Sequence, residues 1–254
     1  MTFGFALGFV LLGHVVADFY LQTNRVARKK SERASLLVLH CGCYALCMAP
    51  FVFASLSFES VVLAWLVLSL SHALVDCGKA RLEGRIEKPL AVFCVDQAIH
   101  VLLCVVVVAT LFDERPAFEI AGIFVGVMDA TSVAAALGIS LTLLVVWRPG
   151  AIFVRLLLES VRIKGSDIVC SGKGAANGLR TGRWIGMLER TIVAVLAFCN
   201  QFGAIAFVLT AKSIARFKML DDKEFAECYL VGTLASTAFA ILASLAVREL
   251  VAWS

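Results

Sequence analysis

Long apolar blocks separated by short polar segments run through almost the whole sequence. A run of about twenty apolar residues, folded as an α-helix, spans the roughly 30 Å hydrocarbon layer of a membrane. Because such blocks recur along the chain, the pattern predicts an all-α fold, a polytopic transmembrane helix bundle of about eight spans. The expected spans are approximately 2–21, 35–56, 59–78, 89–112, 130–147, 184–200, 203–218 and 225–250.

The composition agrees with a membrane protein. Hydrophobic residues make up 61% of the 254 positions, charged residues make up 17%, and the mean hydropathy is +0.91. A soluble domain carries about a quarter charged residues, and a soluble chain this apolar would expose patches that promote aggregation. The expected partner is therefore membrane lipid. The net charge of +4 is modest and gives no reason to expect nucleic acid binding.

Basic residues are concentrated in alternate connections between the predicted spans. Four segments hold 20 of the 23 lysines and arginines, namely 22–33, 79–88, 148–183 and 212–223. An opposite connection, 113–129, holds one arginine against four acidic residues. Because cytoplasmic loops of membrane proteins are enriched in lysine and arginine, the basic segments are predicted to be cytoplasmic and both termini to lie outside.

The middle of the chain contains a different pattern. The run AIFVRLLLESVRIK, residues 151–164, predicts a basic amphipathic helix on the cytoplasmic membrane surface. We therefore expect three segments: a four-helix bundle at 1–112, a middle segment at 113–183 with the fifth span and the amphipathic helix, and a three-span bundle at 184–254.

All four histidines fall in the first four predicted spans, one in each span, and three of them have an aspartate four residues away. Residues four apart lie on the same face of a helix, one turn from each other. The pairs are His14 with Asp18, His72 with Asp76, and His100 with Asp96, and the remaining histidine is His40. At about 1.5 Å of rise per residue, all seven lie in the cytoplasmic half of their spans.

Charged groups inside a membrane are costly, so they face the bundle interior and bind a partner. No matching set of intramembrane cations accompanies these seven residues in the sequence. A divalent metal is the partner that we expect, with zinc favoured and manganese or iron as alternatives, and seven ligands are enough for two ions. Two other interpretations stay open: a structural network of interhelical hydrogen bonds, and a path for protons or ions.

A second group of charged residues lies near the predicted cytoplasmic boundary of the last three spans: Glu189, Lys212, Arg216 and Glu227. One interpretation is a substrate-binding pocket for a lipid phosphate or another acidic headgroup. The alternative is that the basic side chains extend to the membrane surface, as lysine and arginine do near helix ends, with Glu189 pairing with one of them.

Several motifs resemble those of a bacterial inner-membrane family catalogued as a domain of unknown function. They are LLGHVVADFYLQ, LLVLHCG, SLSHALVDCGKARL and FCVDQAIHVLL, and the rear run from GRWIGMLER onward is similar to longer members. The resemblance covers most of the chain except 113–148 and implies a bacterial cytoplasmic membrane. The motif positions that it implies are His14, Asp18, Gln22, His40, His72, Asp76, Lys79, Asp96, Gln97 and His100.

The chain is also loosely similar to multi-pass zinc hydrolases of the ceramidase and progestin/adiponectin-receptor kind, although its motif order departs from theirs and no serine can be assigned to their characteristic position. The leading hypothesis is an intramembrane metal-dependent hydrolase acting on a lipid or lipid-linked substrate. An aspartate among Asp18, Asp76 and Asp96 that does not bind metal would be the general base, and Lys79 would assist with an anionic headgroup. The alternatives are a divalent-cation or proton transporter, and a non-catalytic membrane effector or scaffold.

Overall fold

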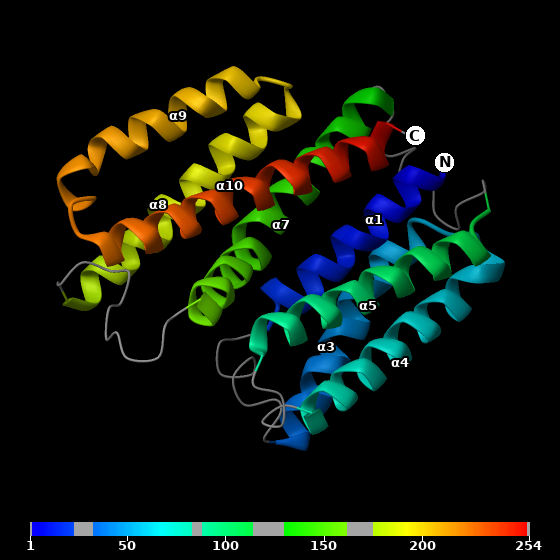
Figure 1. Cartoon of the computed structure of the whole chain (residues 1–254). Coiled ribbons are helices and arrows are strands. Elements are labelled where there is room, and N and C mark those ends of the chain that lie inside the picture. The colour runs from blue at the N-terminus through cyan, green and yellow to red at the C-terminus, as the bar shows by residue number, and fades with distance from the viewer. Residues whose placement is uncertain (1, 23–32, 83–87, 114–129, 162–174, 253–254) are drawn as a thin grey trace. The chain divides into compact units, whose positions relative to one another are not determined.

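The described part of the chain is helical throughout. The computed structural model describes residues 2–22, 33–82, 88–113, 130–161 and 175–252 (Figure 1). The predicted outer connection at 113–129 lies outside these residues except for Asp113. The helices are α1 (Phe3–Val15), the π-helix η1 (Val16–Tyr20), α3 (Ala34–Phe53), α4 (Phe58–Leu82), α5 (Pro89–Leu111), α7 (Ala130–Val161), α8 (Ala175–Phe198), α9 (Phe202–Ala215), the 3-10 helix η2 (Phe217–Met219) and α10 (Lys223–Ala252).

Six segments of the described chain are long and apolar enough to cross a membrane, and they confirm the prediction of a helical membrane protein. These segments are Phe3–Tyr20, Ala34–Phe53, Phe58–Arg81, Pro89–Leu111, Ser132–Val161 and Lys223–Val251. The two remaining predicted spans fall on α8, which carries charged residues in its apolar stretch, and on α9, which has only 14 residues.

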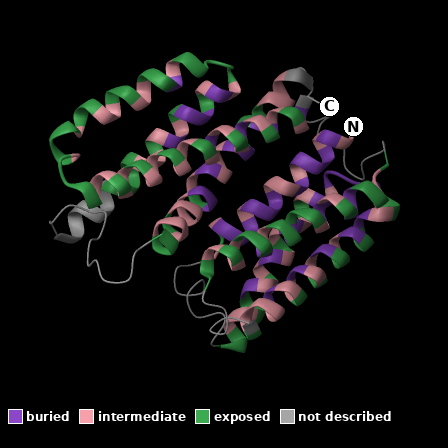
Figure 2. Ribbon diagram, in the orientation of Figure 1, coloured by how far each residue is buried: buried purple, intermediate pink, exposed green. Residues whose placement is uncertain are grey.

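The exposed surface of the helices is rich in large apolar side chains. In α3, α4 and α5, a minority of positions are buried, and the others are exposed or partly exposed (Figure 2). Leu46 and Leu74, for example, are 76% and 72% exposed. In water such a surface would drive association, whereas in a bilayer it faces lipid at no cost.

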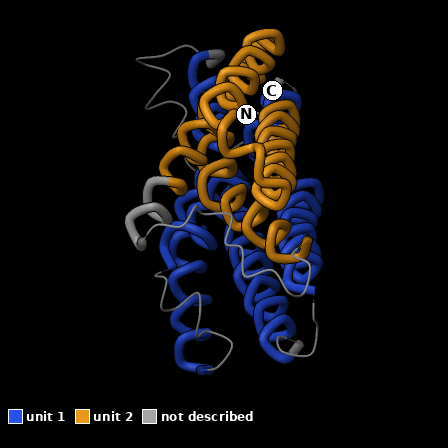
Figure 3. The backbone as a smooth tube through the Cα atoms, turned by 60° about the vertical axis from the view of Figure 1, so that its left-hand side comes forward, with its two compact units in different colours: residues 1–141, 247–254 blue, residues 142–246 orange. Residues whose placement is uncertain are grey.

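The chain forms two compact units, residues 1–141 with 247–254, and residues 142–246 (Figure 3). The boundaries between the units fall inside α7 and α10. The three segments expected from the sequence stay a prediction.

The first unit is a four-helix bundle in which α1 and α4 each contact both α3 and α5 (Figure 1). Its apolar core includes Val10 of α1, Met48 of α3, Leu68 of α4 and Val108 of α5, all buried. The indole of Trp65 ties α4 to α3 by donating a hydrogen bond of 2.7 Å to the carbonyl of Ala45. Most of this core lies away from the ends where α3 and α5 begin and where α1 and α4 end. Those ends are therefore left for the polar side chains.

Helices α1 and α3 approach closely at Gly13, next to His14. A Cβ atom at Gly13 would lie 2.7 Å from Cγ of Phe51, closer than carbon atoms pack. We expect Gly13→Ala to destabilise the protein by about 1–3 kcal/mol, because the two helices must separate. The free energy of unfolding in detergent micelles checks this.

The matched control is Gly42→Ala in α3, where an added Cβ meets nothing within 4 Å. That variant should be neutral or slightly stabilising, since alanine has the higher helix propensity. Equal stability of the two variants would contradict the close packing at Gly13.

The second unit contains α8, α9 and the larger parts of α7 and α10. Residues 151–161 are helical as predicted, but they continue α7 rather than forming a separate helix, even though Pro149 lies inside it. Proline lacks the N–H that would bond to the carbonyl four residues earlier, that of Val145, and its ring crowds this turn of the helix. Here the buried guanidinium of Arg190 donates to the carbonyls of Val146 at 2.6 Å and Trp147 at 3.4 Å. Arg190 thus binds the backbone of α7 in the turn that the proline disturbs, and α7 continues through Pro149.

A tight turn joins α8 to α9. Asn200 adopts a positive φ of 58°, a conformation that asparagine tolerates better than most residues. The N–H of Asn200 donates to the carbonyl of Ala197 at 3.0 Å, and the N–H of Gln201 donates to that of Leu196 at 2.7 Å. This pair of bonds is a Schellman motif, which ends α8 and returns the chain as α9.

Candidate metal centre

The seven histidines and aspartates predicted from the sequence are all buried in the first unit. They lie toward the ends of the helices that adjoin the basic segments. His40 is the seventh residue of α3, Asp96 lies in the first half of α5 and His100 at its middle, and His72 and Asp76 lie in the second half of α4. The structure thus brings together side chains from four helices that alternate in direction, as their depths in the sequence predicted.

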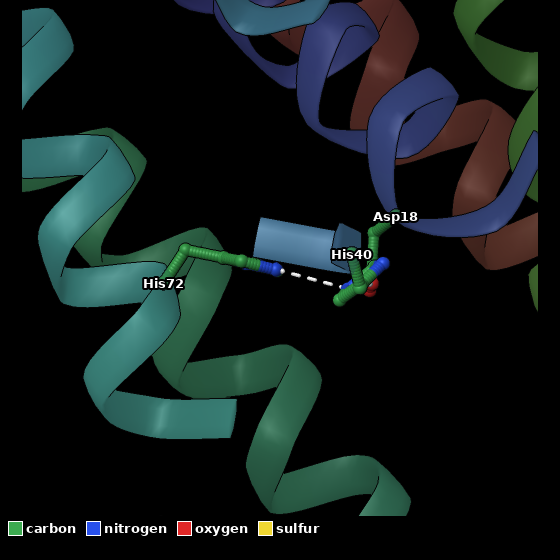
Figure 4. A group of neighbouring side chains, drawn as sticks. All are labelled: Asp18, His40 and His72. Carbon is green, nitrogen blue, oxygen red and sulfur yellow. Dashed lines mark hydrogen bonds and ion pairs between the residues drawn. The ribbon is translucent and has the colours of Figure 1, made fainter. Parts of the chain in front are cut away.

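Asp18, His40 and His72 form the first group of potential metal ligands, and one atom of each lies within 4.8 Å of the others. Their side chains point toward one another (Figure 4). Nε2 of His40 lies 3.3 Å from Oδ1 of Asp18 and 3.2 Å from Nε2 of His72. Tetrahedral ligands that lie about 2.1 Å from a zinc ion are about 3.4 Å from one another, so these separations match a zinc site.

Asp76, Asp96 and His100 form the second group, by the same 4.8 Å criterion. Nε2 of His100 lies 3.7 Å from Oδ1 of Asp96 and 3.9 Å from Oδ1 of Asp76. Both Nε2 of His100 and Oδ1 of Asp96 are buried and make no hydrogen bond. A buried polar atom without a hydrogen bond costs about 1–3 kcal/mol, so a ligand that satisfies both atoms would stabilise the protein.

Asp76 lies between the two groups. Its Oδ2 is 3.2 Å from Nε2 of His40 and 3.8 Å from Nε2 of His72, whereas its Oδ1 faces His100 of the second group. One carboxylate therefore offers one oxygen to each set of ligands.

Asp18 lies on the π-helix η1 that follows α1. Such π-turns change the direction of side chains relative to an α-helix and are frequent at functional sites. The Gln97 amide donates to Oδ2 of Asp18 at 3.0 Å and to Oδ2 of Asp96 at 3.1 Å. The amide of Gln22 donates to the backbone carbonyl of Asp18. Both glutamines are motif positions: Gln97 holds the carboxylates of Asp18 and Asp96, whereas Gln22 binds the backbone at Asp18.

His14 belongs to neither group of described ligands, although the sequence predicted it as a metal ligand. Its Nδ1 is hydrogen-bonded to the hydroxyl of Tyr44 at 3.1 Å, and its ring centroid lies 5.4 Å from that of His100. The buried Tyr44 ring also stacks on His72, with centroids 3.6 Å apart and planes 3° from parallel. Sequence reasoning missed Tyr44, although it follows His40 by four residues and so shares its helix face.

Lys79 is next to the second group. Its Nζ lies 2.8 Å from Oδ2 of Asp96, and its side chain is 24% exposed whereas that of Asp96 is 5% exposed. Lys79 therefore binds an aspartate of the cluster and also connects the cluster to the surface. The structure does not leave this ammonium free for a headgroup, as the sequence hypothesis required.

The predicted substrate-binding residues of the second unit are only partly brought together. Nζ of Lys212 lies 2.7 Å from Oε2 of Glu189 and 5.3 Å from the centre of the Tyr229 ring. Glu189 and Lys212 line a small pocket with Arg190 and the hydroxyl residues Thr233, Ser236 and Thr237.

Arg216 and Glu227 are not among the residues that line this pocket. Arg216 caps the C-terminus of α9 and is half-buried, and Glu227 is exposed. The ion pair between Glu189 and Lys212 therefore agrees with the alternative interpretation, in which Glu189 pairs with a nearby basic residue.

Comparison with known proteins bears on the first unit. No curated protein and no solved structure gives a significant match to the chain. Residues 6–123, which contain the candidate metal centre, are similar to the family described as "Protein of unknown function (DUF3307)", in agreement with the resemblance to a family of unknown function.

Proposed function

We propose that this protein is an intramembrane metal-dependent hydrolase that acts on a lipid or lipid-linked substrate. The observation that carries the proposal is the convergence of three imidazoles and three carboxylates from four helices, at spacings that suit a metal. Buried aspartates in an apolar bundle need neutralising partners. Zinc is the preferred ion, with manganese or iron as alternatives, because imidazole with carboxylate suits these metals.

The chemistry follows from the ligand set and its neighbours. A bound divalent ion would supply a Lewis acid that activates water and polarises a carbonyl or phosphoryl group. Since all three aspartates lie at the ligand positions, we assign the role of general base to His14. Nε2 of His14 is buried without a hydrogen bond, and the Tyr44 hydroxyl fixes its ring through Nδ1.

The alternative of a transporter or channel is less well supported. A conduction path needs polar groups across the whole membrane. Beyond the cluster, the interior of the described bundle is apolar, with Val10, Met48, Val61 and Val108 buried across the four helices. A metal centre accessible from one side therefore suits the packing better than a path through it.

The proposed setting is the bacterial inner membrane, with the cluster in the cytoplasmic half and both termini outside. The basic segments support this orientation through the positive-inside rule. The full count would be eight spans if α8 and α9 cross, and six if they enter and leave on one side. Both counts are even, so both termini stay on one side of the membrane in either case.

We also propose that the second unit binds the phosphate of a lipid headgroup. The pocket beside Lys212, Glu189 and Arg190 combines two cations with one carboxylate and three hydroxyl residues. Two cations against one carboxylate leave a surplus positive charge, which would attract an anionic headgroup to this part of the protein.

The test is elemental analysis of protein purified in detergent without chelator, wild type beside the His72→Ala/His100→Ala double variant. We expect about one or two equivalents of zinc, manganese or iron in the wild type and a loss of at least tenfold in the variant, which lacks one ligand from each group. Metal-loaded protein is then screened against ester, amide and phosphodiester lipids. Absence of metal from the wild type would refute the proposal, and zinc uptake into liposomes without hydrolysis would favour the transporter.

A further inference from the structure

We propose that the cluster holds two divalent ions bridged by Asp76, and that Lys79, bound to Oδ2 of Asp96, weakens the binding of the second ion at Oδ1 of the same carboxylate. This inference rests on the proposed metal centre and specifies how its ligands divide. The ion in the first group would be held entirely by protein. The ion in the second group would be the one that meets the substrate.

The division follows from which oxygen of Asp76 faces which imidazole. Oδ2 lies 3.2 Å from Nε2 of His40, close to the ligand spacing of a tetrahedral site, and so completes the set of Asp18, His40 and His72. Oδ1 faces Nε2 of His100 at 3.9 Å and so belongs with Asp96 and His100. Ions in two-metal sites lie about 3.5–4 Å apart, a separation that one carboxylate bridges with its two oxygens.

The two sets of ligands differ in number. The first has two imidazoles and two carboxylate oxygens, four ligands in all, which is the closed arrangement of structural zinc sites. The second has Asp76, Asp96 and His100, three ligands, which leaves the open position that catalytic zinc sites keep for water or substrate. The open site is also the one next to the partly exposed Lys79, where the cluster reaches the surface.

Charge explains the place of Lys79. Counting only the named groups with neutral imidazoles, three carboxylates, the Lys79 ammonium and one divalent ion carry no net charge. A second divalent ion would make the cluster positive while Lys79 remains on Asp96, at 2.8 Å from Oδ2. Because the ammonium on Oδ2 of Asp96 repels a cation bound to Oδ1 of the same carboxylate, the second ion binds more weakly than the first.

Equilibrium titration of metal-free protein with Mn²⁺, followed by isothermal calorimetry and by electron paramagnetic resonance, tests this inference. We expect the wild type to bind two ions in two separate steps. In the second step, the six-line signal of an isolated ion should give way to the spectrum of an exchange-coupled pair.

Lys79→Met should tighten the second step by about tenfold to a hundredfold, the equivalent of one charge-assisted hydrogen bond, and leave the first unchanged. Lys88→Met is the matched control, since Lys88 is an exposed lysine at the start of α5. Asp96→Asn should keep one equivalent and lose the coupled spectrum.

The outcomes separate the inference from the proposed function. No Mn²⁺ and no zinc bound by the wild type refutes the metal centre itself. One equivalent of bound Mn²⁺ in both the wild type and Lys79→Met at saturating metal would support a metal centre but overturn the two-ion arrangement. Two equivalents with a second step unchanged in Lys79→Met overturns the role of Lys79.

Discussion

Asp76→Asn should remove more bound metal than any other single substitution in the cluster. Asp76 is the one carboxylate that faces ligands of both groups, through Oδ2 to His40 and His72 and through Oδ1 to His100. An amide keeps the size of the side chain but offers a single neutral oxygen, so one ion loses its ligand and the other keeps only an uncharged one. Even groups that only orient metal ligands contribute about tenfold to a hundredfold in affinity, so we expect at least a hundredfold loss here.

Thermal unfolding with and without metal checks this result and excludes simple misfolding. Zinc should raise the Tm of the wild type, because a ligand that binds only the folded state stabilises it. The Asp76→Asn protein without metal should unfold at or above the Tm of the metal-free wild type, since it buries one carboxylate fewer.

Added zinc should barely change the Tm of Asp76→Asn. Glu59→Gln in the first turn of the same helix is the control, because Glu59 is exposed and distant in sequence from the cluster. A Tm increase in Asp76→Asn equal to that of the wild type would show that Asp76 binds no metal.

The second large effect is expected in the second unit. Arg190→Met should destabilise the protein by about 3 kcal/mol, because it removes two charge-assisted hydrogen bonds to the carbonyls of Val146 and Trp147. The exposed Arg183 of the same helix supplies the control, and Arg183→Met should change the free energy of unfolding by less than about 0.5 kcal/mol.

A double-mutant cycle with Pro149→Ala identifies the cause. Alanine restores the missing N–H and a regular helical turn, so the carbonyls depend less on Arg190. We expect Arg190→Met to cost at least about 1 kcal/mol less in the Pro149→Ala background, measured by unfolding in mixed detergent micelles. An equal loss of unfolding free energy in both backgrounds would mean that Arg190 acts independently of the proline. Its contribution would then come from the pocket that it lines with Lys212 and Ser236.

The helices and the composition of the candidate site could be predicted from the sequence because both follow from local rules. Span length and hydropathy identified α1, α3, α4, α5, α7 and α10 as membrane helices. The four-residue spacing placed His72 with Asp76 and Asp96 with His100, and both pairs are in contact, at 3.8 Å and 3.7 Å. Depth from the basic segments indicated that side chains from alternating helices meet at one level.

Other features depended on details that local rules do not contain. The four-residue spacing suggested that His14 and Asp18 act alike, but a π-helix carries Asp18 to His40 while His14 contacts Tyr44. Apolar periodicity gave no reason to single out Tyr44, because a tyrosine on a buried face is an ordinary core residue. The run from residue 151 suggested a separate amphipathic helix, yet α7 continues through Pro149, and Arg190, 41 residues after this proline, donates to the carbonyl of Val146.

The sequence by itself determined that this is a helical membrane protein and which seven polar residues lie buried together in the bundle. Transfer of side chains between water and lipid depends on residue type and on position along a helix, and both can be read from the sequence. Only the tertiary structure decided how the carboxylates divide, with one oxygen of Asp76 toward each group and Lys79 on Asp96. The direction of each side chain depends on helix rotation and on contacts between residues far apart in the chain, which the packing of the four helices fixes.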